Sequence, residues 1–178
     1  ILIADDDTTG IGTVSVADGF GFVTTNNDLS ITANDVDLAG VAGFRVNVGT
    51  GELRIIDSDN GGVALGAAPV PGDFQLEGIE LERINSGAFL AQTGGDITVD
   101  GVSAAQSNSL NDVGNTVDLQ ATGAIIFRNN GSTFNALDLT GTAGISFIGI
   151  VGTDVAVDVE SVVFNSAVTL STGVSDTI

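Results

Sequence analysis

The 178-residue sequence contains no Cys, His, Met, Trp, Tyr or Lys, and these absences exclude much of side-chain chemistry. The chain has no thiol or imidazole nucleophile, no Schiff-base lysine and none of the usual zinc or transition-metal ligands. A disulfide scaffold is excluded as well, so packing and backbone hydrogen bonds must stabilise the fold. We therefore expect that the protein is not an enzyme.

Basic residues are scarce, because 4 Arg stand against 23 acidic residues and give a formal net charge of −19. Proteins bind phosphates and anionic lipids through Lys and Arg, so we expect no nucleic-acid partner. No apolar run reaches the length of a membrane-spanning helix, so we expect no membrane insertion. Residues 1–7 lack both an initiator Met and the basic region of a signal peptide, which suggests a processed chain or an excised fragment.

What the sequence does contain favours strands and turns. Apolar residues make up 43% of the chain, which is too many for an acidic disordered segment. Val, Ile, Leu and Ala dominate this apolar content, while 25 Gly and many Asn, Asp, Ser and Thr supply turn residues. We therefore expect a folded β-rich protein.

A repeat of twenty residues organises the second half of the chain. Ile125 and Phe127 recur as Ile145 and Phe147, which predicts stacked core positions. Four segments that alternate apolar and polar residues have the same spacing: 97–100, 117–120, 137–140 and 157–160. A βαβ unit needs about 30 residues, so helices do not fit between such strands. We predict an all-β fold, a parallel β-helix (β-solenoid) with coils of about 20 residues, as a single domain over residues 1–178.

One stretch, residues 67–87, departs from this pattern and contains both prolines. The spacing of Ile79, Leu81 and Ile84 favours a short helix or 3₁₀ turn on the flank of the solenoid. An additional strand with an irregular corner is the alternative.

Two residue types need a separate assignment. Phe20 and Phe22 fall on one face of an expected strand, so we favour a place in the solenoid core, together with the predicted Phe column, over an exposed ligand platform. Arg45 and Arg54 lie close in sequence and are candidates for a small anion site, but pairing with nearby carboxylates is favoured.

Three segments resemble the repeat region of filamentous-haemagglutinin-like bacterial surface exoproteins: Asn27–Gly40, Ile79–Leu90 and Gly95–Val99. The resemblance covers most of residues 27–165. It implies a right-handed β-helical shaft that belongs to a very large exported adhesin, displayed on the bacterial cell surface or released from it. It supplies no catalytic residues.

Acidic residues provide the candidate metal site. The twenty-residue period stacks Asp118, Asp138 and Asp158 on one outer face, and Asp37 and Asp57 fall in the same spacing. Carboxylates about 5 Å apart repel by roughly 1 kcal/mol in water, and Ca²⁺, which takes six to eight oxygen ligands, would relieve this repulsion. The alternative is a solvated acidic face that salt screens. No cofactor is required by the sequence, and Ca²⁺ is the candidate.

Two further acidic segments are candidates for Ca²⁺ binding. Residues 57–62 resemble the start of an EF-hand loop, but Gly61 and Ala68 stand where that loop needs oxygen ligands, so the match fails. Asp5–Asp7 are expected to form an exposed acidic turn.

The two ends of the chain direct the functional prediction. Apolar strand-like segments, Ile1–Ile3 and Val168–Leu170, stand there without an amphipathic cap. We expect either that neighbouring sequence continues the shaft or that copies associate end to end. The sequence thus predicts a structural segment of an extracellular or cell-surface bacterial fibre or adhesin, with host or matrix glycans as possible partners. The alternatives are a calcium-dependent surface-layer module and a carbohydrate-binding or carbohydrate-degrading solenoid. A concave acidic groove with an aromatic platform would favour the carbohydrate alternative.

Overall fold

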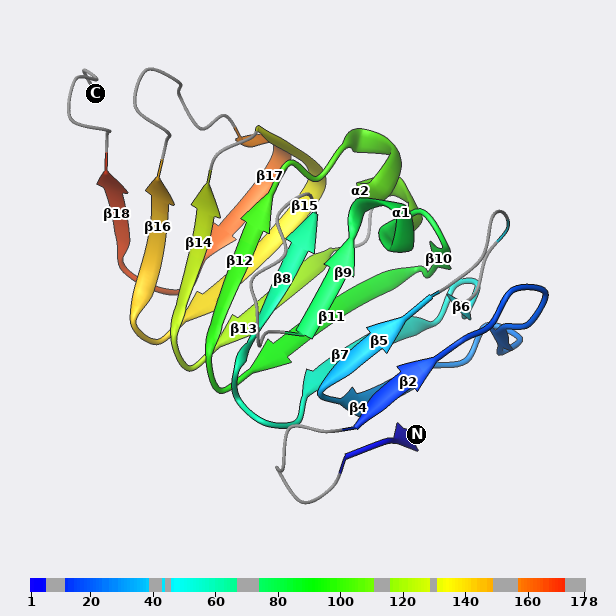
Figure 1. Ribbon diagram of the computed structural model, residues 1–178. Helices are drawn as coiled ribbons and strands as arrows, with labels where there is room; N and C mark the ends of the chain where they lie inside the picture. Colours follow the sequence, from blue (N-terminus) through cyan, green and yellow to red (C-terminus); the bar gives the residue numbers. More distant parts are fainter. Residues whose placement is uncertain are drawn as a thin grey trace.

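A computed structural model describes residues 1–5, 12–38, 43, 46–66, 74–110, 116–128, 131–148 and 157–171. Strands make up most of these residues, and two short helices complete their regular structure (Figure 1). No helix among them is long and apolar enough to cross a membrane. The prediction of an all-β protein is confirmed.

Two sheets contain most of the strands. The seven-stranded sheet has the spatial order β1 (Leu2–Ile3), β4 (Leu29–Ala33), β7 (Glu52–Asp57), β11 (Ala88–Thr93), β13 (Val117–Ala121), β15 (Ser132–Gly141) and β17 (Val157–Phe164). The six-stranded sheet has the order β9 (Phe74–Glu77), β8 (Gly62–Gly66), β12 (Asp96–Asp100), β14 (Ala124–Arg128), β16 (Gly144–Ile148) and β18 (Val168–Ser171).

The remaining elements are short. A three-stranded sheet has the order β3 (Phe22–Val23), β6 (Val46–Asn47) and β10 (Ile84–Asn85), and a two-stranded sheet pairs β2 (Thr13–Ser15) with β5 (Asp35–Asp37). The helices are α1 (Gly78–Leu81) and α2 (Ala104–Leu110).

The strand pairings in the described residues are all parallel. From β7 onward, each strand of the seven-stranded sheet is soon followed along the chain by a strand of the six-stranded sheet, as β13 is by β14 and β15 by β16. We call such a pair of strands with its connections one pass of the chain. The two sheets lie face to face, and successive passes lie side by side from the N-terminal to the C-terminal end (Figure 1).

The core lies between the facing sheets. In β13, alternate side chains point inward, so Leu119 is fully buried while Asp118 beside it is half-buried on the outer face. Register places the inward residues of neighbouring strands in contact, as in the column Ile31, Ile55, Ala91, Leu119 and Leu139. Burying one such Leu or Ile contributes about 1.5–3 kcal/mol.

The predicted Phe column is confirmed. Ile125 pairs with Ile145 and Phe127 with Phe147 across β14 and β16. The Phe127 and Phe147 rings stack with centroids 5.0 Å apart and an interplanar angle of 10°. The core placement of Phe20 is wrong, because this residue lies in the loop before β3 instead of in a strand, and it is 73% exposed.

The prediction of twenty-residue coils is wrong for most of the chain. Val117 pairs with Leu137, twenty residues on, but partners in the same sheet are 24 residues apart for Leu29 and Leu53 and 36 apart for Glu52 and Ala88. The segment 97–100 also belongs to the six-stranded sheet, whereas 117–120 belongs to the seven-stranded one. Strand pairing sets the register within each sheet, but it does not set the length of the connection from the six-stranded sheet back to the seven-stranded one. That connection varies in length, and between β12 and β13 it contains α2.

The irregular excursion near 67–87 is present in its described part, which starts at residue 74. After β8 the chain enters β9, which pairs with β8 through Val63 and Phe74, so it passes through the six-stranded sheet twice before continuing. The predicted short helix follows as α1. The Glu80 carboxylate accepts a hydrogen bond of 2.9 Å from the Glu77 N–H at the start of α1, as in a capping box.

Glycines bring neighbouring passes together at the corner between the two sheets. A Cβ atom on Gly95 would lie 2.6 Å from the Asn60 carbonyl oxygen, and one on Gly123 would lie 2.6 Å from the Gly95 carbonyl oxygen. The Gly123 N–H donates to that Gly95 oxygen at 2.9 Å. The hydrogen bonds between strands thus continue through the corner because no side chain separates the backbones.

Candidate functional site

The predicted acidic column lies on the outer face of the seven-stranded sheet. Asp118 on β13 and Asp138 on β15 are direct partners, as the twenty-residue spacing predicted. Toward the N-terminus, the same column continues through Leu90 on β11 to Arg54 on β7. The column is therefore acidic over two adjacent strands and contains a basic residue two strands away.

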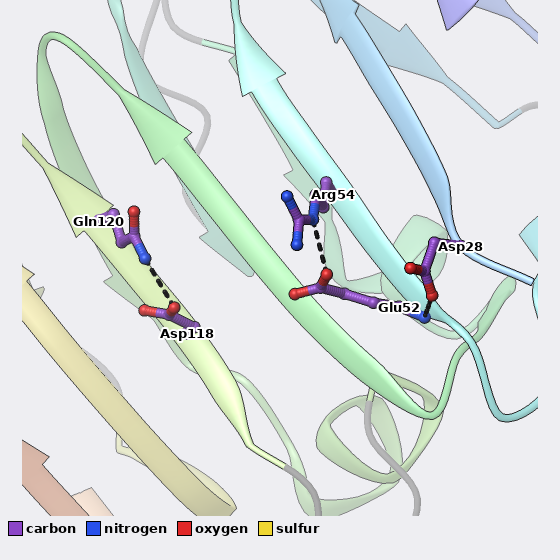
Figure 2. A network of polar contacts seen from close by, with 5 residues as sticks. All are labelled: Asp28, Glu52, Arg54, Asp118 and Gln120. Carbon is purple, nitrogen blue, oxygen red and sulfur yellow. Dashed lines mark hydrogen bonds and ion pairs between the residues drawn. The ribbon is translucent and has the colours of Figure 1, made fainter. Parts of the chain in front are cut away.

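Asp118 is a partly buried acid on this face. Partial burial raises the pKa of its carboxyl group, and the negative charges of Asp138 and Glu52 raise it further. The Gln120 side-chain amide donates a 2.7 Å hydrogen bond to Asp118, which opposes this shift (Figure 2). The outer face at Asp118 and Asp138 thus carries negative charge that no neighbouring basic group in the described part of the column neutralises, so it attracts cations.

Arg54 neutralises a different acid on the same face. Its Nε lies 2.6 Å from a carboxylate oxygen of Glu52, whose backbone N–H donates to Asp28 at 2.9 Å (Figure 2). The hydrogen bond and charge of Glu52 raise the pKa of Arg54. The prediction that Arg54 pairs with a carboxylate is confirmed, and Arg45 lies outside the described residues.

Asp158, the third member of the predicted column, does not align with Asp118 and Asp138. Asp158 on β17 pairs with Thr133, whereas the β17 partner of Asp138 is Val163. The prediction of an Asp118–Asp138–Asp158 stack is wrong at Asp158, because β17 follows β15 at an offset of 25 residues, as between Ser132 and Val157, instead of twenty. β15 has ten residues, so β17 has room to align with its first half.

Asp37 and Asp57 do not extend the column either. Asp37 belongs to the two-stranded sheet, and the Asp57 side chain is buried at the end of β7. Within the described part of the chain, no group of three or more carboxylates gathers closely enough to hold a metal ion. Ca²⁺ binding at Asp118 and Asp138 stays a prediction.

Comparison of the chain with protein-family models, with curated proteins and with solved structures gives no match. The similarity to filamentous-haemagglutinin-like exoproteins therefore rests on the sequence segments that suggested it. The functional argument has to be made from the geometry of this chain.

Sequence analysis missed a buried carboxyl group at the corner between β7 and β8. Asp57 is 5% exposed, and its Oδ2 accepts hydrogen bonds from the Thr93 hydroxyl at 2.6 Å and from the Gly62 N–H at 3.1 Å. Burial, together with a hydrogen bond and charge from Asp59, raises the pKa of Asp57 to about 6. The sequence did contain a sign of this burial. Asp57 follows Leu53 and Ile55 at alternate positions, so its side chain is expected to point inward as theirs do.

Further polar groups surround Asp57. The carboxylate of Asp59 accepts from the Asn34 side chain at 2.7 Å, and Asp5 accepts from the Ser58 hydroxyl at 3.1 Å. Asp5 is 5% exposed, so the expectation of an exposed turn is wrong at this residue, while Asp6 and Asp7 lie outside the described residues. The arrangement can hold a proton near neutral pH inside the corner.

An acidic groove of about 290 Å³ lies where β5 meets β9 and α1. Its charged lining residues are Asp35, Asp37, Glu77, Glu80 and Arg83. Burial raises the pKa of Glu80, although hydrogen bonds from the Leu38 and Glu77 N–H groups oppose the shift. No aromatic residue lines the groove, so it lacks the platform expected of a carbohydrate-degrading solenoid.

Proposed function

We propose that this chain is a segment of the rigid shaft of an extracellular bacterial fibre or adhesin, wound as a right-handed parallel β-helix. The strand order carries the proposal: β7, β11, β13, β15 and β17 add in sequence order to one sheet, and β8, β12, β14, β16 and β18 add in sequence order to the other. Each pass of the chain then corresponds to one coil of the helix. Right-handed crossovers are the rule for parallel strands, which supports the handedness.

Such a stack extends along one axis. Each coil contacts its neighbours, so stability grows as coils are added and the rod has no intrinsic length limit. The outer faces carry charged and polar side chains such as Asp118, Arg54 and Gln120, and the chain has no cysteine or histidine for redox or metal chemistry. These features suit a scaffold better than an enzyme.

The two ends of the stack support its continuation. At the N-terminal end, β1 is the edge of the seven-stranded sheet, and Ile1 and Ile3 are 93% and 55% exposed. At the C-terminal end, β17 and β18 are edges, and Val163 and Phe164 are 49% and 43% exposed. Edge strands of soluble proteins are usually blunted by charge or covered, so apolar edges favour pairing with further strands.

Incomplete burial at the ends points the same way. Leu2 and Phe22 near the first coil, and Phe147, Val157 and Val162 near the last, pack against the core but are only partly buried. A groove of about 260 Å³ beside β2 and β3 includes Phe20 and Phe22 in its lining. One more coil at each end would cover these side chains, and either neighbouring sequence or a second copy would supply it.

Sedimentation velocity and negative-stain electron microscopy test the open ends. We expect association that increases with protein concentration and produces rods one molecule wide. The Phe164→Asp variant should weaken it, because a charge on an apolar edge strand opposes pairing. The matched control is Ile79→Asp, which places the same charge on α1, where the side chain is 52% exposed but lies on the flank.

Hydrogen exchange on the dilute monomer separates open ends from closed ones. The amides of β1, β17 and β18 should exchange much faster than those of β11 and β13 in the middle of the stack. Equal protection in all of these strands, together with a monomer at every concentration, would contradict the proposal. Antibodies raised against the chain should label intact source cells if the shaft is displayed outside them.

A further inference from the structure

One side of the molecule carries a row of asparagines. An asparagine precedes or lies within each of five successive strands of the seven-stranded sheet, β4, β7, β11, β13 and β15. Three of these asparagines belong to β6, β10 and α2, which lie along one side of the molecule (Figure 1). The members of this asparagine row are Asn26, Asn47, Asn85, Asn108 and Asn135. Because successive strands of a sheet lie about 4.8 Å apart, the row follows the axis of the stack.

Hydrogen bonds fix the orientation of these amides. Asn85 Nδ2 donates to Asn47 Oδ1 at 2.9 Å, and Asn135 Nδ2 donates to Asn108 Oδ1 at 2.9 Å. Asn26 Oδ1 accepts from the Thr50 N–H at 3.1 Å. Each amide thus uses one end for a neighbour in the stack, which leaves a defined end for another partner.

The row is interrupted between Asn85 and Asn108. No hydrogen bond within the described residues joins these two side chains or engages Asn85 Oδ1 and Asn108 Nδ2. Both residues line one groove of about 230 Å³, together with Asn26, Gly49, Thr50 and Ser86. An acceptor and a donor are therefore available in the same groove.

The groove is electrically neutral in a strongly acidic protein. None of its lining residues carries a charge, although the whole chain has a formal net charge of −19. A charged ligand would find no counter-charge in this groove, and an apolar ligand would leave the amides without partners. The lining suits a ligand that offers several donors and acceptors without charge.

Backbone geometry keeps the groove in shape. Asn26 has a left-handed φ of 55°, and Gly49 opposite it has a φ of 59°. A Cβ atom on Gly49 would lie 2.2 Å from Asn26 Oδ1, so the glycine leaves the space that the Asn26 amide occupies. Groups that are fixed before binding lose less entropy when a ligand arrives.

We propose that this groove binds a neutral saccharide. One sugar hydroxyl donates to Asn85 Oδ1, and an adjacent hydroxyl accepts from Asn108 Nδ2, which completes the interrupted row. Hydroxyl groups both donate and accept, so a vicinal diol fits two amides that present opposite ends. Asn26 lines the same groove and would contact the next sugar unit. The inference is independent of the shaft function, because it rests on one groove and not on the ends of the stack.

The test is a titration of the full-length, ¹⁵N-labelled protein with cellohexaose, mannohexaose and chitohexaose, and with anionic oligogalacturonate for comparison. We expect saturable shifts of the amides around Asn26, Gly49, Asn85 and Asn108 with at least one neutral oligosaccharide, and weaker or no binding of oligogalacturonate. Asn85→Ala and Asn108→Ala should each weaken binding about 3- to 10-fold, the value of one hydrogen bond.

The matched control is Asn165→Ala. Asn165 bonds Asp138 and Thr140 on another face, so this variant should bind as the wild type does. Circular dichroism confirms that each variant is folded. The proposal is overturned if no neutral oligosaccharide gives saturable shifts, if oligogalacturonate binds more tightly, or if the two groove variants bind with unchanged affinity. None of these outcomes affects the association test at the stack ends.

Discussion

Replacing Asp57 with asparagine should make the stability of the protein less dependent on pH. The carboxyl group of Asp57 has a pKa of about 6 in the folded protein against 3.8 for an unperturbed aspartate, because it is buried at the corner beside Asp59. The folded state therefore binds this proton more tightly than the unfolded state does. Stability from this group is fully present below pH 3.8 and is lost as the pH rises through about 6.

The size of the effect follows from the two pKa values. The difference between the pKa values of Asp57 in the folded and unfolded states corresponds to about 3 kcal/mol of unfolding free energy, since one pKa unit is worth about 1.4 kcal/mol. Between pH 8 and pH 5 about half of this free energy, on the order of 1–2 kcal/mol, is recovered. We choose pH 5 as the lower limit because the isoelectric point near 4.1 makes precipitation a problem at lower pH.

Urea denaturation followed by far-ultraviolet circular dichroism measures the effect, because the chain has neither Trp nor Tyr for fluorescence. Other acids also titrate, so the wild type should gain stability on acidification for several reasons. The difference between wild type and Asp57→Asn isolates this residue. This difference should change by about 1–2 kcal/mol between pH 8 and pH 5, with the variant relatively more stable at pH 8.

Asp37→Asn is the matched control, because it removes one negative charge from an exposed position on β5. A pH-dependent stability difference that appears in Asp57→Asn and not in this control therefore belongs to the buried corner. The reasoning is refuted if the Asp57→Asn difference is the same at both pH values, or if the variant loses stability toward pH 8.

Three other predictions concern packing and the acidic face. Phe127→Ala should lower the free energy of unfolding by about 3–5 kcal/mol. Phe20→Ala, at a 73% exposed loop position, should change it by less than about 0.5 kcal/mol. Similar urea midpoints for the two variants would contradict the placement of Phe127 in the core. Gly95→Ala should cost about 1–3 kcal/mol or more, because its Cβ would lie 2.6 Å from the Asn60 carbonyl oxygen, and an unchanged midpoint would show that the corner can open. If Ca²⁺ binds at Asp118 and Asp138, the melting temperature should be higher in Ca²⁺ than in EDTA and this shift should disappear in Asp118→Asn, so equal wild-type melting in both buffers removes the calcium hypothesis.

The alternation of apolar and polar residues was sufficient to predict strands β13 and β15. Val117, Leu119, Leu137 and Leu139 face the core as expected, and the twenty-residue repeat gives the correct register between β13 and β15. This success is local, because a period read from one pair of strands carries no information about connections elsewhere. The error at Asp158 followed from extending that period across a pass of different length.

Other features depend on contacts between distant parts of the chain. The asparagine row and the buried Asp57 corner bring together residues from separate passes, such as Asn85 with Asn47 and Asp57 with Thr93. Neither pair has a regular spacing in the sequence. The return of the chain through β9 is equally invisible in the hydrophobic pattern, because that pattern shows only that a strand is present.

The direction of the hydrogen bonds between strands has a mechanical consequence. β1 and β18 are edge strands at opposite ends of the stack, so the two parts of the chain are separated along the direction of those bonds (Figure 1). Tension applied between the ends would peel off one strand at a time, breaking a few bonds in each step instead of shearing many together. The segment would therefore resist compression and bending better than stretching, and under tension it would lengthen strand by strand.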